Sequence, residues 1–309
     1  MKLINSRAEL LPWLSGLEGV YKTIEVAGRT CYKSEEKITD DSAKGFVDRM
    51  VASKHTAMLE HGTVYLQLPD TEDFVFYHEN PYSKLRLCPD GSFAVTTNYR
   101  VLVENNKLED LKYICDPTEH HEMRYSFKFT TDRGVSHELV RHRVFSFAQE
   151  STRYCNYSKD KFGNELTFIR PSWSSLPLGE FKALLPAKDL PNGAVAYNDN
   201  RFAEASDCDQ DIIFVRTCLQ AEDSYKALLD KGCTPQEARQ VLPNALKTEI
   251  VMTGFASDWR FFFDLRLFGK TGAPHPDMKA LAERAYIEAS KQDILRDIES
   301  YPSKFDNNE

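Results

Sequence analysis

The spacing of apolar residues changes between two periods along the chain, and these periods predict a mixture of helices and strands. Between Asp40 and Lys54 the apolar residues recur three and four positions apart, which is typical of one buried helix face. Residues 211–232 show the same pattern and end at Gly232, a residue type that commonly terminates helices. Alternation of apolar and polar residues predicts strands at 63–68, 93–103, 124–131 and 166–171.

A helix followed by a polar loop is predicted in the middle of the chain. Gly134 begins the helix GVSHELVRHRVF, which should end near Ser146 and leave AQESTRY (148–154) as a loop. Within thirteen residues this stretch holds three arginines, Arg141, Arg143 and Arg153. Guanidinium groups bind planar or phosphorylated anions through paired hydrogen bonds. The loop amides, with Ser151 and Arg153, are therefore suited to holding a phosphate.

The last third of the chain begins with a strong helix signal. Thr234 is a suitable N-cap, Pro235 occupies the first helical position, and Glu237 completes a capping box. This helix carries EARQVLP (237–243), and the run continues through residues 248–266, where FFFDLR ends a helix. The stretch 269–286 then begins the last helix.

Composition narrows the class of protein. With 309 residues, 41% hydrophobic and 28% charged, the chain is typical of a soluble globular protein. The formal net charge of −8 argues against a nucleic-acid partner. No apolar run approaches the roughly 18 residues that a membrane helix needs. The seven cysteines contain no CxxC pair and the N-terminus lacks a signal-peptide core, so we expect a cytoplasmic protein with free thiols.

Together the elements predict an α+β fold in which helices pack on an antiparallel sheet. We expect one domain over residues 1–309. Between residues 69 and 131 turn signals alternate with strand-like runs, which predicts an elaborated sheet region. From Trp173 to Gln210 Pro, Gly, Asn and Asp recur, which predicts a long connection or surface insertion.

Several histidines invite a metal interpretation that their spacing does not support. His55, Glu60 and His61 have no evident further partner, and a hydrogen-bonded turn before a strand is the favoured alternative. His137 and His142 are five residues apart, whereas a zinc-protease motif places its two histidines four apart on one helix face. We therefore expect no bound metal.

The sequence also lacks the common motifs for nucleotide binding and for a catalytic nucleophile. The His-His-Glu segment at 120–122 is interpreted as a solvated loop. The sequence has no GxGxxG and no P-loop, so phosphate binding must rest on arginines and loop amides. No cluster of Ser, Cys and His suggests a nucleophile triad. Chemistry should therefore depend on a cofactor, with the protein supplying position and electrostatics.

Three separated motifs carry a resemblance to a known family. The first is Arg141-His142-Arg143, then seven residues, Ser151, one residue, Arg153 and Tyr154. The second is HTAMLEH, which begins at His55. The third is EARQVLP with Arg239, followed 27 residues later by Arg266. In these motifs the chain resembles the flavin-dependent thymidylate synthases.

The resemblance implies reductive methylation of dUMP to dTMP. FAD, reduced by NADPH, would pass a hydride to the one-carbon unit of methylenetetrahydrofolate on its way to C5 of dUMP. It also implies a homotetramer with active sites where subunits meet. Three positions depart from the family pattern: Ala57 replaces a hydroxyl residue, and Phe255 and Phe261 replace flavin-contacting Asn.

The resemblance assigns roles to individual residues. Arg266 is the expected catalytic residue, placed against the uracil edge. The expected cofactor-binding residues are His55, Arg141, His142, Arg143 and Gln149. The expected substrate-binding residues are Arg141, Gln149, Glu150, Ser151, Thr152, Arg153, Arg239 and Arg266.

Two rival interpretations come from other protein classes. A single-stranded nucleic-acid binder would use the arginines and aromatics of 141–157 as a stacking platform, but the net charge argues against it. A classical thymidylate synthase would need a cysteine nucleophile. Cys155 lies nearest the first motif, and a small buried apolar role is favoured for it.

Overall fold

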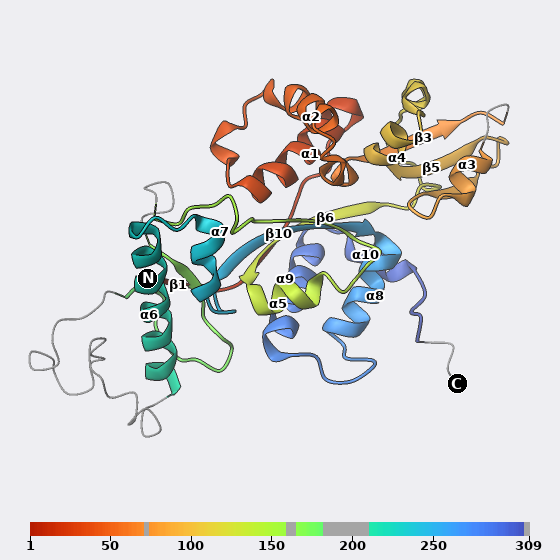
Figure 1. The fold of residues 1–309 in the computed structure, drawn as a ribbon. Helices are drawn as coiled ribbons and strands as arrows, with labels where there is room; N and C mark the ends of the chain where they lie inside the picture. Colours follow the sequence, from red (N-terminus) through yellow and green to blue (C-terminus); the bar gives the residue numbers. More distant parts are fainter. Residues whose placement is uncertain (71–73, 159–164, 182–209, 306–309) are drawn as a thin grey trace, which may run out of the picture. The chain divides into compact units, whose positions relative to one another are not determined.

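The computed structural model describes residues 1–70, 74–158, 165–181 and 210–305 (Figure 1). These residues form two compact units that are interleaved along the chain. The first unit comprises residues 1–7, 130–139 and 151–248, and the second comprises 8–129, 140–150 and 249–309. The interpretation of 1–309 as one domain stays a prediction.

In the second unit, two helices and a three-stranded antiparallel sheet share a hydrophobic core. Helix α1 (Gly16–Tyr32) packs on α2 (Ser42–Ala52). The strand order is β3-β5-β4, with β5 (Phe93–Asn98) between β3 (Thr63–Leu68) and β4 (Lys84–Leu87). Apolar side chains from both layers, among them Ile24, Phe46, Leu66 and Val95, form one buried cluster, because each element buries only one face or stripe.

A second sheet has the order β2-β6-β10-β7. Its strands are β2 (Arg7–Leu10), β6 (Arg124–Asp132), β10 (Lys247–Phe255) and β7 (Ser146–Gln149). The helices that follow β10 are α8 (Ala256–Arg266), α9 (Pro276–Lys291) and α10 (Leu295–Ser300). Trp259 and Phe262 of α8 lie against Phe127 and Phe129 of β6, and all four side chains are fully buried.

The first unit has a smaller sheet with the order β8-β1-β9. Strand β1 (Lys2–Ile4) pairs in parallel with β8 (Thr167–Ile169) and antiparallel with β9 (Gly179–Glu180). Its helices are α5 (Arg133–Leu139), α6 (Gln210–Asp230) and α7 (Pro235–Ala238). The apolar face of α6 packs in a core with Leu3, Phe168 and Leu246.

The remaining elements are short, and all but one of them belong to the second unit. These are α3 (Val75–Glu79), α4 (Tyr99–Glu104) and 3-10 turns at Glu35–Lys37, Thr56–His61 and Leu108–Tyr113, with Arg239–Val241 in the first unit. Within the described residues, every helix is too short or too polar to span a membrane.

The α+β fold predicted from the sequence is confirmed, and so are most of its strong periodic signals. The predicted helix at 40–54 is α2, and the capping box at Thr234 and Glu237 is present. The strand predicted at 93–103 is wrong beyond Asn98, because the Asn98 side chain accepts a hydrogen bond from the Val101 N–H at 3.2 Å and starts α4. Most of the connection predicted at 173–210 lies outside the described residues.

The predicted central helix is wrong in its second half. Helix α5 ends at Leu139, and two turns follow, closed by Arg143 N–H to Arg141 O and Phe145 N–H to His142 O, both at 3.0 Å. Residues 146–149, predicted as the helix end and the start of a loop, form β7 and pair with β10. The first half of the 248–266 run is likewise the strand β10. Pairing between strands distant in sequence decided these segments against local pattern.

Candidate functional site

The site in the second unit centres on the turn that carries Arg141, His142 and Arg143. His142 is buried, with 6% of its surface exposed, and its Nε2 accepts a hydrogen bond from Arg266 Nε at 3.0 Å. The structure thus brings together two residues 124 positions apart in sequence. Arg141 and Arg143 are exposed on either side, so this turn presents two cations to solvent and one imidazole to the interior.

The neighbours of His142 keep its imidazole neutral. Burial and the nearby Arg266 cation lower the pKa of His142 from its ordinary value of 6.5 to about 4. The ring stands at 64° to Phe262, with 5.1 Å between centroids. A neutral imidazole accepts the Nε–H bond that an imidazolium cannot accept. His142 therefore fixes the orientation of the Arg266 guanidinium at neutral pH.

Packing beneath the turn explains its shape. Phe145 is buried against Trp259, with ring centroids 4.8 Å apart at 74°. A Cβ at position 254 would stand 2.3 Å from Phe145 Cδ1. Gly254 is therefore needed for this close approach, and it lets the ring hold the turn against β10 and α8.

The residues that follow the turn are placed by strand pairing. Gln149 lies opposite Ile250 in the β7–β10 register. The Glu150 N–H donates to Glu249 O at 2.7 Å, which extends this pairing by one residue. The prediction that the Glu150 amide helps to hold a phosphate is therefore wrong, because that donor is already used.

The first unit holds the remaining predicted substrate residues. Arg239 Nη1 donates to Thr152 Oγ1 at 3.2 Å, and Arg153 Nε donates to Gln236 Oε1 at 3.1 Å. Both arginines are exposed, whereas Thr152 is buried. Residues 236–239 are thereby joined to the Ser151–Arg153 loop by two side-chain hydrogen bonds.

Ser151 shapes this loop. Its hydroxyl accepts a hydrogen bond from the Arg153 N–H at 3.3 Å, and its carbonyl accepts one from the Cys155 N–H at 3.0 Å. Cys155 is 1% exposed and belongs to the hydrophobic core of the first unit. A thiol in that setting is not accessible for attack on a substrate, as the sequence interpretation favoured.

His55, Glu60 and His61 of the HTAMLEH stretch contact separate partners. His55 is exposed and its Nδ1 lies 3.2 Å from Tyr32 Oη. Glu60 forms an ion pair with Arg100. His61 is fully buried, and its Nδ1 lies 2.8 Å from Thr253 Oγ1. Among the described residues no three potential ligands converge on a metal position.

His61 belongs to a buried polar chain that sequence reasoning missed. Thr253 Oγ1, its partner, also lies 2.7 Å from Ser126 Oγ. Burial, with a contribution from Arg124, lowers the pKa of His61 to about 3. The chain links the 3-10 turn at 56–61 to the neighbouring strands β10 and β6. Alternation along β6 places Ser126 on the face opposite Phe127 and Phe129, and β10 is buried on both faces around Thr253, so strand periodicity did not point to this chain.

A cluster of four charges was also missed. Lys33 Nζ and Lys128 Nζ lie 2.7 and 2.8 Å from Glu249 Oε2, and 3.2 and 3.3 Å from Glu35 Oε1. Burial opposes the charge on Lys33, but Glu249 and nearby Glu150 raise its pKa above the ordinary value. The cluster is locally neutral and fixes Glu249, the residue whose carbonyl pairs with Glu150.

The aromatic residues at 255 and 261 are engaged within the second unit. Phe255 is 6% exposed, and its ring faces Arg124 Cζ at 5.3 Å and Lys84 Nζ at 5.5 Å. Phe261 stacks on Phe305 at 15°, with 5.6 Å between centroids. Cation–π and ring-stacking contacts therefore occupy these positions.

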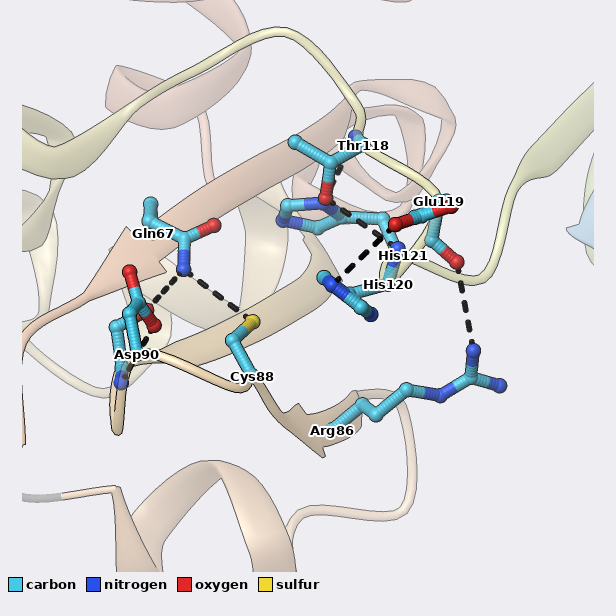
Figure 2. A network of polar contacts seen from close by, with 9 residues as sticks. Gln67, Arg86, Cys88, Asp90, Thr118, Glu119, His120 and His121 are labelled. Carbon is cyan, nitrogen blue, oxygen red and sulfur yellow. Dashed lines mark hydrogen bonds and ion pairs between the residues drawn. The ribbon is translucent and has the colours of Figure 1, made fainter.

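The solvated loop predicted at 120–122 is wrong for His121. This side chain is 5% exposed, and Figure 2 shows it among the polar groups beside the β3-β5-β4 sheet. Its Nδ1 accepts from the Thr118 N–H at 3.1 Å, and its Nε2 donates to Leu66 O at 3.1 Å. With both ring nitrogens bonded, His121 fastens the loop to β3 and is not a metal ligand.

Comparison with known proteins gives a consistent result. Residues 112–293 match the family described as "Thymidylate synthase complementing protein". A flavin-dependent thymidylate synthase from Mycobacterium avium (strain 104) is 24% identical over 258 residues, which cover 83% of this chain and 71% of that protein. Another, from Geobacter sulfurreducens, is 31% identical over 134 residues, or 43% of each chain.

Solved structures are more distant. Thymidylate synthase X from Helicobacter pylori with FAD and dUMP aligns over 96% of this chain and all of that chain, at 15% identity and a TM-score of 0.39. The UMP/dUMP methylase PolB from Streptomyces cacaoi bound with 5-Br dUMP aligns over 97% and 98%, at 16% identity and a TM-score of 0.43.

Proposed function

This chain belongs to the thymidylate synthase complementing protein family, as its sequence motifs predicted, and we propose that it catalyses the reductive methylation of dUMP to dTMP. The one-carbon donor is methylenetetrahydrofolate, and FAD reduced by NADPH is the hydride carrier. The observation that carries the proposal is the hydrogen bond from Arg266 Nε to His142 Nε2, because it joins two of the family's motifs in one unit.

The residues present fit a flavin dinucleotide. A pyrophosphate carries two negative charges, and the exposed Arg141 and Arg143 side chains offer two guanidinium groups for it. Exposed His55 and partly exposed Gln149 add further hydrogen-bonding groups. When bound, FAD supplies the hydride. His142 is too well buried and too acidic to serve as a cation for phosphate, so its role is to orient Arg266.

Arg266 is the proposed catalytic residue. Cys155, the cysteine nearest the first motif, is buried and cannot add to C6, so C5 of the pyrimidine must become nucleophilic in another way. A guanidinium beside N3 and the C4 carbonyl polarises the ring toward its anion, and it stays charged throughout. Neutral His142 orients the Arg266 guanidinium by accepting a hydrogen bond from Arg266 Nε. The aromatic residues of α8 limit the access of water to this guanidinium.

Arg153 and Arg239 are the proposed phosphate ligands of dUMP. Each guanidinium is oriented by one hydrogen bond, Arg153 to Gln236 and Arg239 to Thr152, and both side chains are exposed. A nucleotide phosphate accepts charge-assisted hydrogen bonds from such groups. We further propose a cytoplasmic homotetramer, in which neighbouring subunits complete each active site. The −8 net charge is consistent with small-molecule partners alone.

Replacement of Arg266 tests the proposal. Arg266→Ala should lower dTMP formation by roughly a hundred- to a thousandfold, the usual effect of losing one preorganised electrostatic contact. Flavin absorbance and NADPH oxidation should persist, because neither depends on polarising the pyrimidine. The matched control is Arg296→Ala, which removes an exposed arginine from α10. If Arg266→Ala turns over dUMP within a fewfold of the control, Arg266 is structural and the assignment fails.

A further inference from the structure

A cavity of about 300 Å³ lies in the second unit, apart from the residues assigned above. Its walls come from the segment after β2, the first turns of α1, the start of β6 and the segment between α9 and α10. None of the residues proposed to bind flavin or dUMP lines it. Its volume is at the lower end of the range for small-molecule sites.

The polar end of the cavity is formed by Arg124. This side chain is 6% exposed, and its Nη1 donates to Glu60 O at 3.2 Å and to Thr63 Oγ1 at 3.4 Å. Its Nε is buried and has no hydrogen-bond partner among the described residues. Within the part of the chain that the structure describes, no carboxylate lies within ion-pair distance of this guanidinium. The ring of Phe255, 5.3 Å from Cζ, offers only partial compensation.

A buried cation without a hydrogen-bonded counter-ion is unfavourable, and the Asp258 and Glu60 carboxylates favour the Arg124 charge only from beyond ion-pair distance. Proteins normally meet that cost with a buried carboxylate, as Glu25 does for Arg29 in the same unit, where Oε1 lies 3.0 Å from Nη2. Arg124 has no such partner within the described residues, and it opens on a cavity. The missing anion is therefore expected to come from a ligand.

The rest of the lining is mainly apolar. Leu10, Leu11, Leu14 and Val20 contribute aliphatic surface, and Trp13 contributes a ring that is 42% exposed and stands edge-on to Tyr65 at 6.4 Å. Among the described residues that line the cavity, Arg124 is the one cation. A single guanidinium balances a carboxylate, whereas a phosphate dianion would keep an excess charge in an apolar setting.

We propose that this cavity is a second ligand site, which binds a small aromatic carboxylate with its ring between Trp13 and Val20 and its carboxylate on Arg124. The ring replaces water on apolar walls, and the carboxylate supplies the counter-ion that Arg124 lacks. Such a ligand is distinct from flavin and from dUMP in both size and charge. This site does not depend on the activity proposed above.

Calorimetric titration with 2-naphthoate and its neutral isostere 2-naphthamide tests the proposal. Naphthoate should bind roughly ten- to a hundredfold more tightly, since a hydrogen bond to a charged group contributes about 1.5–3 kcal/mol. Arg124→Met, which keeps an unbranched side chain, should abolish that preference. Arg86→Met, an exposed arginine of the same unit, is the matched control and should leave it unchanged.

A second variant tests the proposal independently, in case Arg124→Met does not fold. Ile294 is half-buried in the cavity wall, and Ile294→Trp should fill the space and block both probes. Saturating FAD and dUMP should not displace naphthoate. Equal affinity for the two probes, no binding of either, undiminished binding to Ile294→Trp, or displacement by FAD or dUMP would each overturn the proposal.

Discussion

Acidification should destabilise this protein through His142, and the size of the effect follows from the structure. Burial and Arg266 hold the pKa of this imidazole at about 4 in the folded state, against an ordinary value of 6.5 in the unfolded chain. Between these two values the unfolded state binds the proton and the folded state does not. The contribution of neutral His142 to the free energy of unfolding is therefore present in full above pH 6.5. It is lost as the pH falls from 6.5 toward 4.

The folded-state and unfolded-state pKa values of His142 determine how much stability is lost on acidification. Integrating proton uptake between pH 7 and pH 5 gives a loss of about 2 kcal/mol for this one group. The loss levels off below pH 4, where the folded state is protonated too. Protonation also removes the acceptor of Arg266 Nε and places two cations side by side, so the Arg266 fork should lose its orientation over the same range.

Urea unfolding at half-unit steps from pH 7 to pH 4.5 measures this contribution. The informative variant is His142→Gln, because an amide oxygen can still accept from Arg266 but does not titrate. Between pH 7 and pH 5 the free energy of unfolding should decrease in both proteins. The decrease should be about 2 kcal/mol smaller in the variant than in the parent. His78→Gln, which replaces an exposed histidine, should follow the parent. If His142→Gln and the parent lose stability in parallel, His142 is not held neutral by its surroundings.

Three further outcomes are expected. Arg239→Ala should raise the KM for dUMP roughly ten- to a hundredfold while deoxyuridine, which lacks the phosphate, changes little; equal losses for both would place Arg239 elsewhere. Cys155→Ala should retain dTMP formation, because the buried thiol is not a nucleophile, and a nucleotide adduct on Cys155 in a mass spectrum would refute this. Thr253→Val should destabilise the fold by about 1–3 kcal/mol in chemical denaturation, since it strands buried polar atoms of His61 and Ser126; an unchanged midpoint would mean that these atoms have other partners.

The sequence by itself determined the family, the α+β class and the elements with strong periodicity. Residues 42–52 and 210–230 are helices because their apolar residues line one face, and 63–68 and 124–132 are strands because theirs alternate. The Thr234 capping box needed only residues three apart. Signals of this kind are local, so they survive without knowledge of the rest of the fold.

Tertiary structure decided the details of the site. Helical spacing extended the central helix through Arg143, but β7 exists because residues 146–149 pair with β10, a hundred residues later in the chain. The hydrogen bond between His142 and Arg266, the depressed pKa of His142 and the use of the Glu150 amide all follow from that pairing and from the packing of α8. Burial and long-range contact set these properties, and neither is written in the spacing of residues along the chain.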